Sequence, residues 1–229
     1  MKKVVALIQA RMGSSRLPNK MMLSLHGKPI LHWVLQRVSK SKNIDEVVLA
    51  TSVNRENDIL ENYTKHNFKN VKVFRGSEDD VLNRFYKAGK NAQASHIVRV
   101  CADNPLIDGV EIDRLVDFYF QNSFDYAYNH IPKNNTYPDG LGAEILSFQI
   151  LEEMEKKVKS ENLREHSFSY VWENMENFQI GTFNPPKEIA FPNLRFDIDT
   201  FDDYYYLSSL NFDIDIDSAD LVKLFSEKK

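Results

Sequence analysis

Apolar runs alternate with helix-forming stretches along the first hundred residues of the chain. The runs that predict buried strands lie at residues 4–8, 46–51, 71–74 and 96–101. Helices are expected between them, at about 29–38, 56–66 and 79–93. Regular alternation of strand and helix predicts an α/β fold with a mostly parallel sheet, flanked by helices that make right-handed crossovers. Ligands of such sheets bind beyond the carboxyl ends of the strands.

The first strand end carries the most distinctive stretch, residues 8–20. It contains one glycine, two adjacent serines and the cations Arg11, Arg16 and Lys20. Small residues let backbone N–H groups converge on an anion, and nearby cations neutralise phosphate oxygens. The stretch matches neither the Walker A pattern nor the glycine pattern of dinucleotide-binding folds. It predicts a phosphate-binding loop of another kind, with a solvated turn as the alternative.

Three aspartates are candidate metal ligands. Asp103 follows the strand at 96–101. Asp197 and Asp199 form an Asp-x-Asp pattern that reads as part of a strand, where a period of two places both carboxylates on one face. Such a pair repels unless a cation lies between, and Mg²⁺ takes one or two protein carboxylates together with substrate phosphates. The alternatives are an Asx-turn at Asp103 and a solvated edge at Asp197 and Asp199.

Residues 75–84 read as a strand end followed by a helix start. Ser77 is expected to cap the helix at 79–93, with acidic residues in its first turn. Capping accounts for Ser77 but not for Arg75 and Gly76, which lie beside the proposed phosphate loop. Both therefore stay candidates for nucleotide contact.

The second half of the chain is less regular. Residues 129–142 are rich in Asn, Pro and Gly and predict a long loop. The remaining expectations are helices at about 148–159 and 165–176, a last strand at 191–199 that returns to the sheet, and packing helices at 201–210 and 218–228. We expect one domain over residues 1–229, with a small lobe inserted at about 129–185.

Composition narrows the function. The chain has 29 basic and 33 acidic residues and a net charge of −4, which argues against nucleic-acid binding by general electrostatic attraction. The one cysteine, Cys101, excludes an intrachain disulfide and fits a reducing compartment. No stretch approaches the roughly 18–20 apolar residues of a membrane span. We expect a cytoplasmic protein with small-molecule partners, and neither nucleic acid nor a membrane among them.

Short motifs along nearly the whole chain match those of one family. They are residues 8–20, Arg75-Gly-Ser-Glu-Asp-Asp-Val-Leu82, Asp103-Asn-Pro-Leu-Ile107, Tyr137-Pro-Asp-Gly140, Arg164-Glu-His166, and Asp197-Ile-Asp199 with Asp202-Asp203. Together they resemble the CMP-sugar synthetase superfamily of acylneuraminate and Kdo cytidylyltransferases, most closely its spore-coat polysaccharide branch. The resemblance implies a nucleotide-diphospho-sugar transferase-like fold, CTP as the donor, Mg²⁺ as the cofactor and a homodimer.

The resemblance also implies roles for particular residues. Arg11, Ser15, Arg16 and Lys20 would bind the triphosphate, and Asp103 and Asp199 the metal, with Asp197 assisting. The full set expected at the nucleotide is Ala10, Arg11, Gly13, Ser14, Ser15, Arg16, Lys20, Arg75, Gly76 and Ala102. The acceptor is expected under the 129–142 loop, beside Asp139, Glu144, Glu165 and His166. Catalysis falls to Arg11, Arg16, Lys20 and Asp103.

The expected reaction is transfer of CMP from CTP to an oxygen of a sugar acid or a related acceptor, with release of pyrophosphate. Positioning and charge neutralisation should supply most of the catalysis, and the product would be an activated precursor for surface polysaccharide or glycan synthesis. A sugar-phosphate nucleotidyltransferase and a metal-dependent glycosyltransferase are alternatives, as is a nucleotide sensor without catalysis. The three cations of residues 8–20 favour a triphosphate over a diphosphate.

Overall fold

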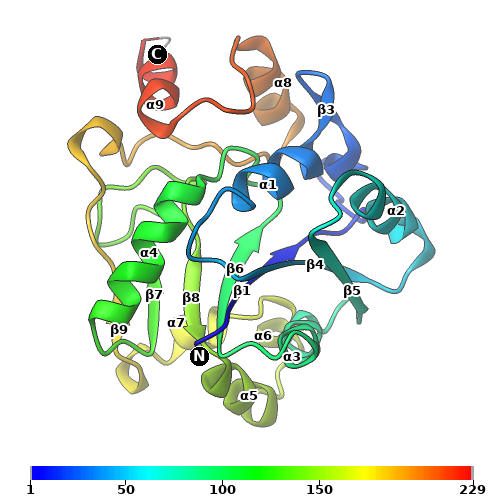
Figure 1. The fold of residues 1–229 in the computed structure, drawn as a ribbon, viewed down its shortest axis with the longest axis vertical. Helices are drawn as coiled ribbons and strands as arrows, with labels where there is room; N and C mark the ends of the chain where they lie inside the picture. The colour runs from blue at the N-terminus through cyan, green and yellow to red at the C-terminus, as the bar shows by residue number, and fades with distance from the viewer. Residues whose placement is uncertain (1, 228–229) are drawn as a thin grey trace.

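The computed structural model describes residues 2–227, and a seven-stranded sheet forms its centre (Figure 1). The strand order is β5-β4-β1-β6-β8-β7-β9. The strands are β1 (Val4–Gln9), β4 (Glu46–Ser52), β5 (Val71–Gly76), β6 (His96–Cys101), β7 (Tyr126–Tyr128), β8 (Glu144–Ser147) and β9 (Ile180–Gly181). Within the sheet formed by residues 2–227, β8 alone runs antiparallel to its neighbours. The predicted mostly parallel sheet is confirmed.

The winding of the chain reverses beside β1. From β1 the chain adds β4 and then β5 on one side, and it adds β6 on the other side. In open α/β sheets such a reversal opens a crevice outside the carboxyl ends of the two strands between which it occurs. The segments that follow β1 and β6 therefore meet at one place, as the strand pattern predicted.

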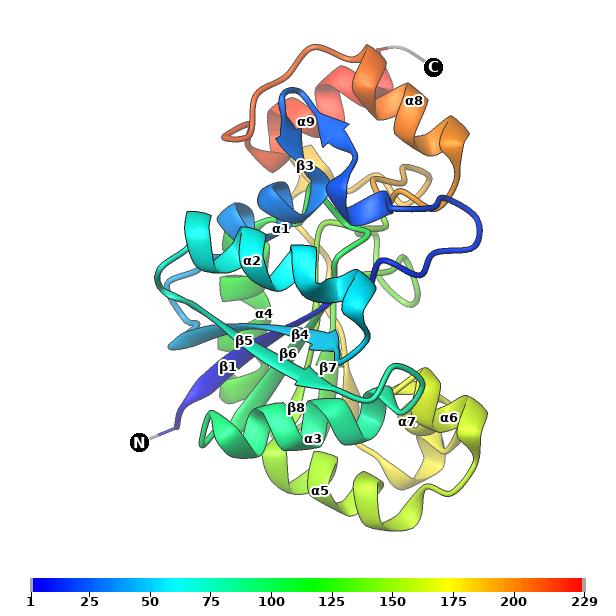
Figure 2. The same cartoon turned by 90° about the vertical axis from the view of Figure 1, so that its right-hand side faces the viewer.

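Helices cover both faces of the sheet. Figure 2 shows α1 (Ile30–Val38) and α2 (Asp58–Asn67) on one side, and α3 (Val81–Asn91) and α5 (Phe148–Lys157) on the other; α4 (Gly109–Gln121) packs on the side of α1. Side chains alternate between the faces along a strand. Val4, Ala6 and Ile8 accordingly belong to the core under α1, and Val5 and Leu7 to the core under α3.

The carboxyl-terminal helices pack as predicted. They are α8 (Phe201–Ser209) and α9 (Ser218–Ser226), which lie beside the hairpin of β2 (Ser24–Leu25) and β3 (Lys28–Pro29) (Figures 1 and 2). Tyr204 of α8 donates a hydrogen bond to the backbone oxygen of Ser24. The predicted end of the last helix at Lys228 lies outside the described residues.

Several elements differ from the prediction. The helix expected at 165–176 is instead α6 (Glu161–Glu165), α7 (Ser169–Glu173) and the 3-10 turn η3 (Met175–Asn177). The break occurs at His166, whose backbone leaves the helical region, and it lets Phe168 pack in the core. α4 was not predicted. β7, β8 and β9 were also missed, since strands of two to four residues are too short for an alternation signal.

Two further predictions are corrected by backbone contacts. Residues 191–199 are extended but form no strand of the sheet; they bond to loop atoms past the strand ends, as when Ile198 donates to the backbone oxygen of Asp103 at 2.8 Å. Ser77 does not cap α3; the cap is Asp80, which accepts from the backbone N–H of Asn83.

Residues 129–185 are built into the domain. They contribute β8 and β9 to the central sheet and α5, α6 and α7 to one of its faces. The predicted loop at 129–142 joins β7 to β8. Among residues 2–227, no helix is both long enough and apolar enough to cross a bilayer.

Candidate active site

A cavity of about 310 Å³ opens where the carboxyl ends of β1 and β6 meet. Most of the predicted site residues line it. They are Ala10, Arg11, Gly13, Ser14, Ser15, Arg16, Lys20, Ala102, Asp103, Glu165, His166 and Asp199. Segments more than 180 residues apart thus contribute to one site.

The loop after β1 is held by fixed polar contacts. The backbone N–H of Met12 donates to Oδ1 of Asn57 at 2.8 Å, and Asn57 in turn donates to Oγ of Ser52. Asn57 is fully buried. A Cβ on Gly13 would lie 3.1 Å from a carboxylate oxygen of Glu56, so a larger residue there would require a small shift of that side chain. The loop therefore has a defined shape before any ligand binds.

The outer end of the cavity holds two cations between two acids. Arg16 makes a bidentate contact with Asp199, at 3.1 and 3.0 Å. Lys20 is nearly buried, and its Nζ lies 3.5 Å from Asp199 and 3.7 Å from Asp103. The expected meeting of Arg16 and Lys20 with Asp103 and Asp199 is therefore present in the structure.

Backbone contacts place Asp199. Leu194, Phe196 and Ile198 are buried, and the residues between them face outward, so the period of two predicted for this segment is confirmed. Lys20 Nζ donates to the backbone oxygen of Ile198 at 2.6 Å. A capping box of Thr200 and Asp203 starts α8, and Asp203 also accepts from the N–H of Asp199.

Asp197 shares the face of Asp199 but not its environment. It pairs with Arg195 through two contacts and does not line the cavity. Asp139 also lies outside the cavity lining. Burial, and then the charge of Asp197, raises the pKa of Asp139 to about 6. These two acids therefore lie beside the outer end of the cavity and not in its wall.

Burial also acts on Asp103. It raises the pKa of the Asp103 carboxyl, as does the neighbouring Asp199, whereas Lys20 lowers it. Two carboxylates held this close favour a cation between them. Lys20 provides that cation in the structure.

Arg11 connects the loop after β1 with two other elements. Its guanidinium lies 3.5 Å from Glu78, which precedes α3, and 3.3 Å from Glu165 at the end of α6. Glu78 also accepts from Asn57 at 3.4 Å. All three cations predicted to bind phosphate are thus paired with acids.

The inner end of the cavity is a floor of strand side chains. Gln9, Arg99 and Cys101 line it. Arg99 is paired in the sheet register with Glu144 of β8, and the two side chains form a close ion pair. Tyr126 donates to the other oxygen of Glu144. Burial alone would raise the pKa of Glu144, but the charges of Arg99 and His130 and the hydrogen bonds from Tyr126 and Arg99 together outweigh it, and the pKa lies below its usual range.

This arrangement corrects the expectation for Glu144. It is 2% exposed and does not line the cavity, so its carboxylate faces Arg99 and Tyr126 and not a substrate. The aspartates at the strand ends could be found from the sequence, but Gln9, Arg99 and Cys101 were missed. The available signal was a charged residue, Arg99, inside an otherwise apolar strand.

Arg75 and Gly76 also lie outside the cavity. Arg75 donates to the backbone oxygens of Ser52 and Asn54 and pairs with Asp58 and Glu61. Its guanidinium therefore ties β4 to α2. A Cβ on Gly76 would lie 3.0 Å from the side chain of Arg84, so a larger residue there would crowd that side chain.

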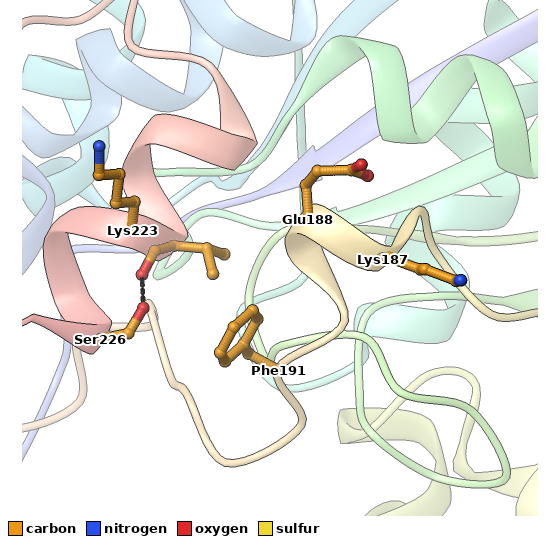
Figure 3. Close-up of a pocket in the computed structure, with 6 residues that line it drawn as sticks. Lys187, Glu188, Phe191, Lys223 and Ser226 are labelled. Atoms are coloured by element: carbon orange, nitrogen blue, oxygen red, sulfur yellow. Dashed lines mark hydrogen bonds between the residues drawn. The ribbon is translucent and has the colours of Figure 1, made fainter.

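A larger cavity, of about 410 Å³, lies between the 3-10 turn η4 (Lys187–Ile189) and α9 (Figure 3). Phe191 lies between the two elements, and Lys187 and Glu188 extend to the opposite side from Lys223. It shares no lining residue with the cavity at the strand ends. Convergent charges and not volume identify the functional site.

Fold and cavity together define the class of protein. The molecule has the features of an α/β protein that binds a nucleotide through its phosphates. These features are a switch point between parallel strands, a loop of small residues with three cations, and two acids at the same place.

Comparison with known proteins gives the family. A family model described as cytidylyltransferase matches residues 5–229, and the chain belongs to that family. It is 32% identical to the spore coat polysaccharide biosynthesis protein SpsF of Bacillus subtilis, over 92% of this chain and 87% of that protein.

Solved structures agree with this assignment. A cytidylyltransferase from Leptospira borgpetersenii is 34% identical with a TM-score of 0.90, covering 100% of this chain and 95% of that one. A CMP:2-keto-3-deoxy-manno-octonic acid synthetase complexed with CTP has a TM-score of 0.67 at 17% identity, over 90% and 97% of the two chains. The second comparison shows the shared fold.

Proposed function

We propose that this enzyme transfers CMP from CTP to an oxygen of a sugar acid and releases pyrophosphate. Membership of the cytidylyltransferase family excludes the glycosyltransferase alternative. The main support is the meeting of four charged side chains at the strand switch point. Arg16 pairs with Asp199, and Nζ of Lys20 lies within 3.7 Å of both Asp103 and Asp199. The sugar-acid acceptor is supported by the names of the relatives.

The residues fit a magnesium-dependent reaction. Asp103 and Asp199 offer two carboxylates that both approach one cation, Lys20. Mg²⁺ uses one or two protein carboxylates and completes its shell with phosphate oxygens and water. Asp103 and Asp199 would hold Mg²⁺, and the bound ion would neutralise charge on the phosphates.

The remaining residues of the outer end would act on the nucleotide. Arg16 and Lys20 would bind phosphate oxygens and stabilise the charge that develops on the leaving pyrophosphate. Arg11 would do the same from the opposite side of the loop. The shaped backbone around Gly13 and Ser14 would supply N–H donors. Glu165 and His166, on the α6 side, would face the acceptor.

A homodimer in the cytoplasm is part of the proposal. The family resemblance supports the dimer, and the single cysteine supports a reducing compartment. Light scattering on a size-exclusion column measures the first directly.

A pyrophosphate-release assay tests the proposed function. The protein is incubated with Mg²⁺, one of the four nucleoside triphosphates and a panel of 3-deoxy-2-keto sugar acids. Release with CTP and one acid, absent with EDTA, is the expected result. No release with any acceptor, or equal release with ATP, contradicts the proposal.

A further inference from the structure

The floor of the cavity is built differently from its outer end. Gln9 of β1 and Cys101 of β6 are neighbours in the sheet register, and Arg99 lies two residues before Cys101 on the same face. His166 closes the floor from the end of α6. Gln9, Arg99 and Cys101 are strand positions, so their part of the floor is as rigid as the sheet.

Arg99 differs from the outer cations in where its acid lies. Arg16 and Lys20 pair with Asp199, which itself lines the cavity. Glu144, the partner of Arg99, is buried behind it and is absent from the lining. A ligand in the cavity therefore meets the guanidinium of Arg99 and not the carboxylate.

The floor has hydrogen-bond donors to spare. Nη1 of Arg99 binds Glu144, while Nη2 has one long contact of 3.4 Å with Oε1 of Gln9. A guanidinium has five N–H donors, so Nη2 retains an N–H for a ligand.

Unmatched polar atoms gather around the same ion pair. Nε of Arg99, Nδ1 of His130 and Oγ of Ser167 are buried without a hydrogen-bond partner within residues 2–227. The charges of Glu144 and Arg99 both act on His130. Ser167 precedes Phe168, whose ring lies 5.8 Å from the Arg99 guanidinium. Such atoms are rare in folded interiors. Arg99 lines the cavity whereas His130 and Ser167 do not, so the polar surroundings of the ion pair extend behind the floor.

We propose that Arg99 binds an anionic group of the acceptor, a carboxylate or a phosphonate, and so determines which acceptors are used. The inference rests on the proposed cytidylyl transfer and deepens it. Glu144 and Tyr126 are positioning residues, since they orient the guanidinium from behind. Gln9 supports the same guanidinium from the side. The fork of arginine suits both anions, because it can bind two oxygens at once.

The test removes the charge pair without leaving one charge buried. The double variant Arg99→Gln/Glu144→Gln is compared with the wild type. The chain offers a matched control in Arg114→Gln/Glu111→Gln. There a buried acid accepts from Tyr137 at 2.7 Å and lies 3.3 Å from an arginine, and neither residue lines the cavity.

The first readout is kinetic. With 3-deoxy-manno-octulosonate as the acceptor, we expect KM for the acceptor to rise about 100-fold in the Arg99/Glu144 variant. KM for CTP and kcat should change by no more than about 3-fold, well inside one tenfold step, and the control double variant should match the wild type. An acceptor KM that moves no further than in the control overturns the proposal.

The second readout is binding, and it does not need turnover. Thermal shifts are recorded with CMP and Mg²⁺ present, for 3-deoxy-manno-octulosonate, its methyl ester and 2-aminoethylphosphonate. Protection by the acid but not the ester, lost in the Arg99/Glu144 variant, assigns a carboxylate; protection by the phosphonate alone assigns a phosphonate. Protection by neither anion, or protection that survives the substitutions, overturns the proposal. Anion protection without pyrophosphate release contradicts only the proposed function.

Discussion

The two ends of the cavity hold their charges in opposite ways. At the outer end, Arg16, Asp103 and Asp199 stand on loops past the strand ends, and cations and acids face one another across the space. At the floor, Arg99 and Glu144 stand opposite each other on adjacent strands, and the acid is hidden. A charged side chain on a loop can change its ion-pair partner, because loops are more mobile than strands. A charged side chain in a strand keeps the partner that the register places opposite it. The outer end therefore suits ligands that bring their own charges, and the floor suits recognition.

The largest effect is expected from Asp103→Ala, which breaks the outer end. Asp103 is proposed to hold the Mg²⁺ that neutralises charge on the phosphates, and its loss should lower kcat about 10³-fold. The pyrophosphate-release assay measures it. Asp215→Ala is the matched control, because that exposed acid pairs with Lys40 and neither residue lines the cavity. A kcat within about 3-fold of the wild type, under half a decade, would remove Asp103 from the site.

Glu144→Ala breaks the floor instead. It leaves the Arg99 charge without its acid in a buried place, and removal of one member of a buried pair destabilises a protein by about 3–5 kcal/mol. Urea unfolding should show this loss. The double variant Arg99→Gln/Glu144→Gln should lose less. Equal losses in both would mean that the packing around Glu144, and not the charge of Arg99, is what matters.

Arg16→Ala tests the contrast between the two ends, because the Arg16–Asp199 ion pair is exposed whereas the Arg99–Glu144 pair is buried. Arg16 is 64% exposed, and such pairs contribute about 0–1 kcal/mol to stability. The free energy of unfolding should hardly change. KM for CTP should rise about 10- to 50-fold, through loss of a bidentate phosphate contact. Arg55→Ala, at an exposed position outside the cavity, should leave KM for CTP unchanged.

The smallest expected effect concerns Asp139, beside the outer end. Its pKa is raised to about 6 from an ordinary value of 3.8. The folded state therefore holds a proton that the unfolded state has lost between about pH 4 and 6, and this acid makes stability fall as pH rises through that window. In Asp139→Asn, stability should fall less steeply as pH rises through that window. Thermal melting without divalent cations, at pH 4.5 and 7.5, measures it; identical slopes in the two proteins would contradict the raised pKa.

The sequence was sufficient for what depends on local pattern. The apolar strands at 4–8 and 96–101, the loop with Arg16 and Lys20, and the acids that end their segments all carry a signal in neighbouring residues. Their meeting could be predicted because parallel strands bring their carboxyl ends to one edge.

What failed depends on register and on tertiary packing. Nothing near Arg99 indicates that Glu144, 45 residues later, stands opposite it, since β8 was too short to predict. The break at His166 follows from the burial of Phe168, which a helical pattern does not reveal. Arg75 was assigned to the nucleotide because its position at a strand end was visible and its partners on α2 were not.

Arg16 and Asp199 should separate when the substrate binds, so that Arg16 contacts the nucleotide and Asp199 contacts its metal. Equilibrium binding of CTP to the wild type and to Asp199→Asn, each with Mg²⁺ and with EDTA, tests it most directly. The wild type should bind CTP far more tightly with Mg²⁺. The variant, with Arg16 and Lys20 released from their acid, should bind metal-free CTP at least as tightly as the wild type and gain little from Mg²⁺. Equal gains from Mg²⁺ in the two proteins would contradict the claim.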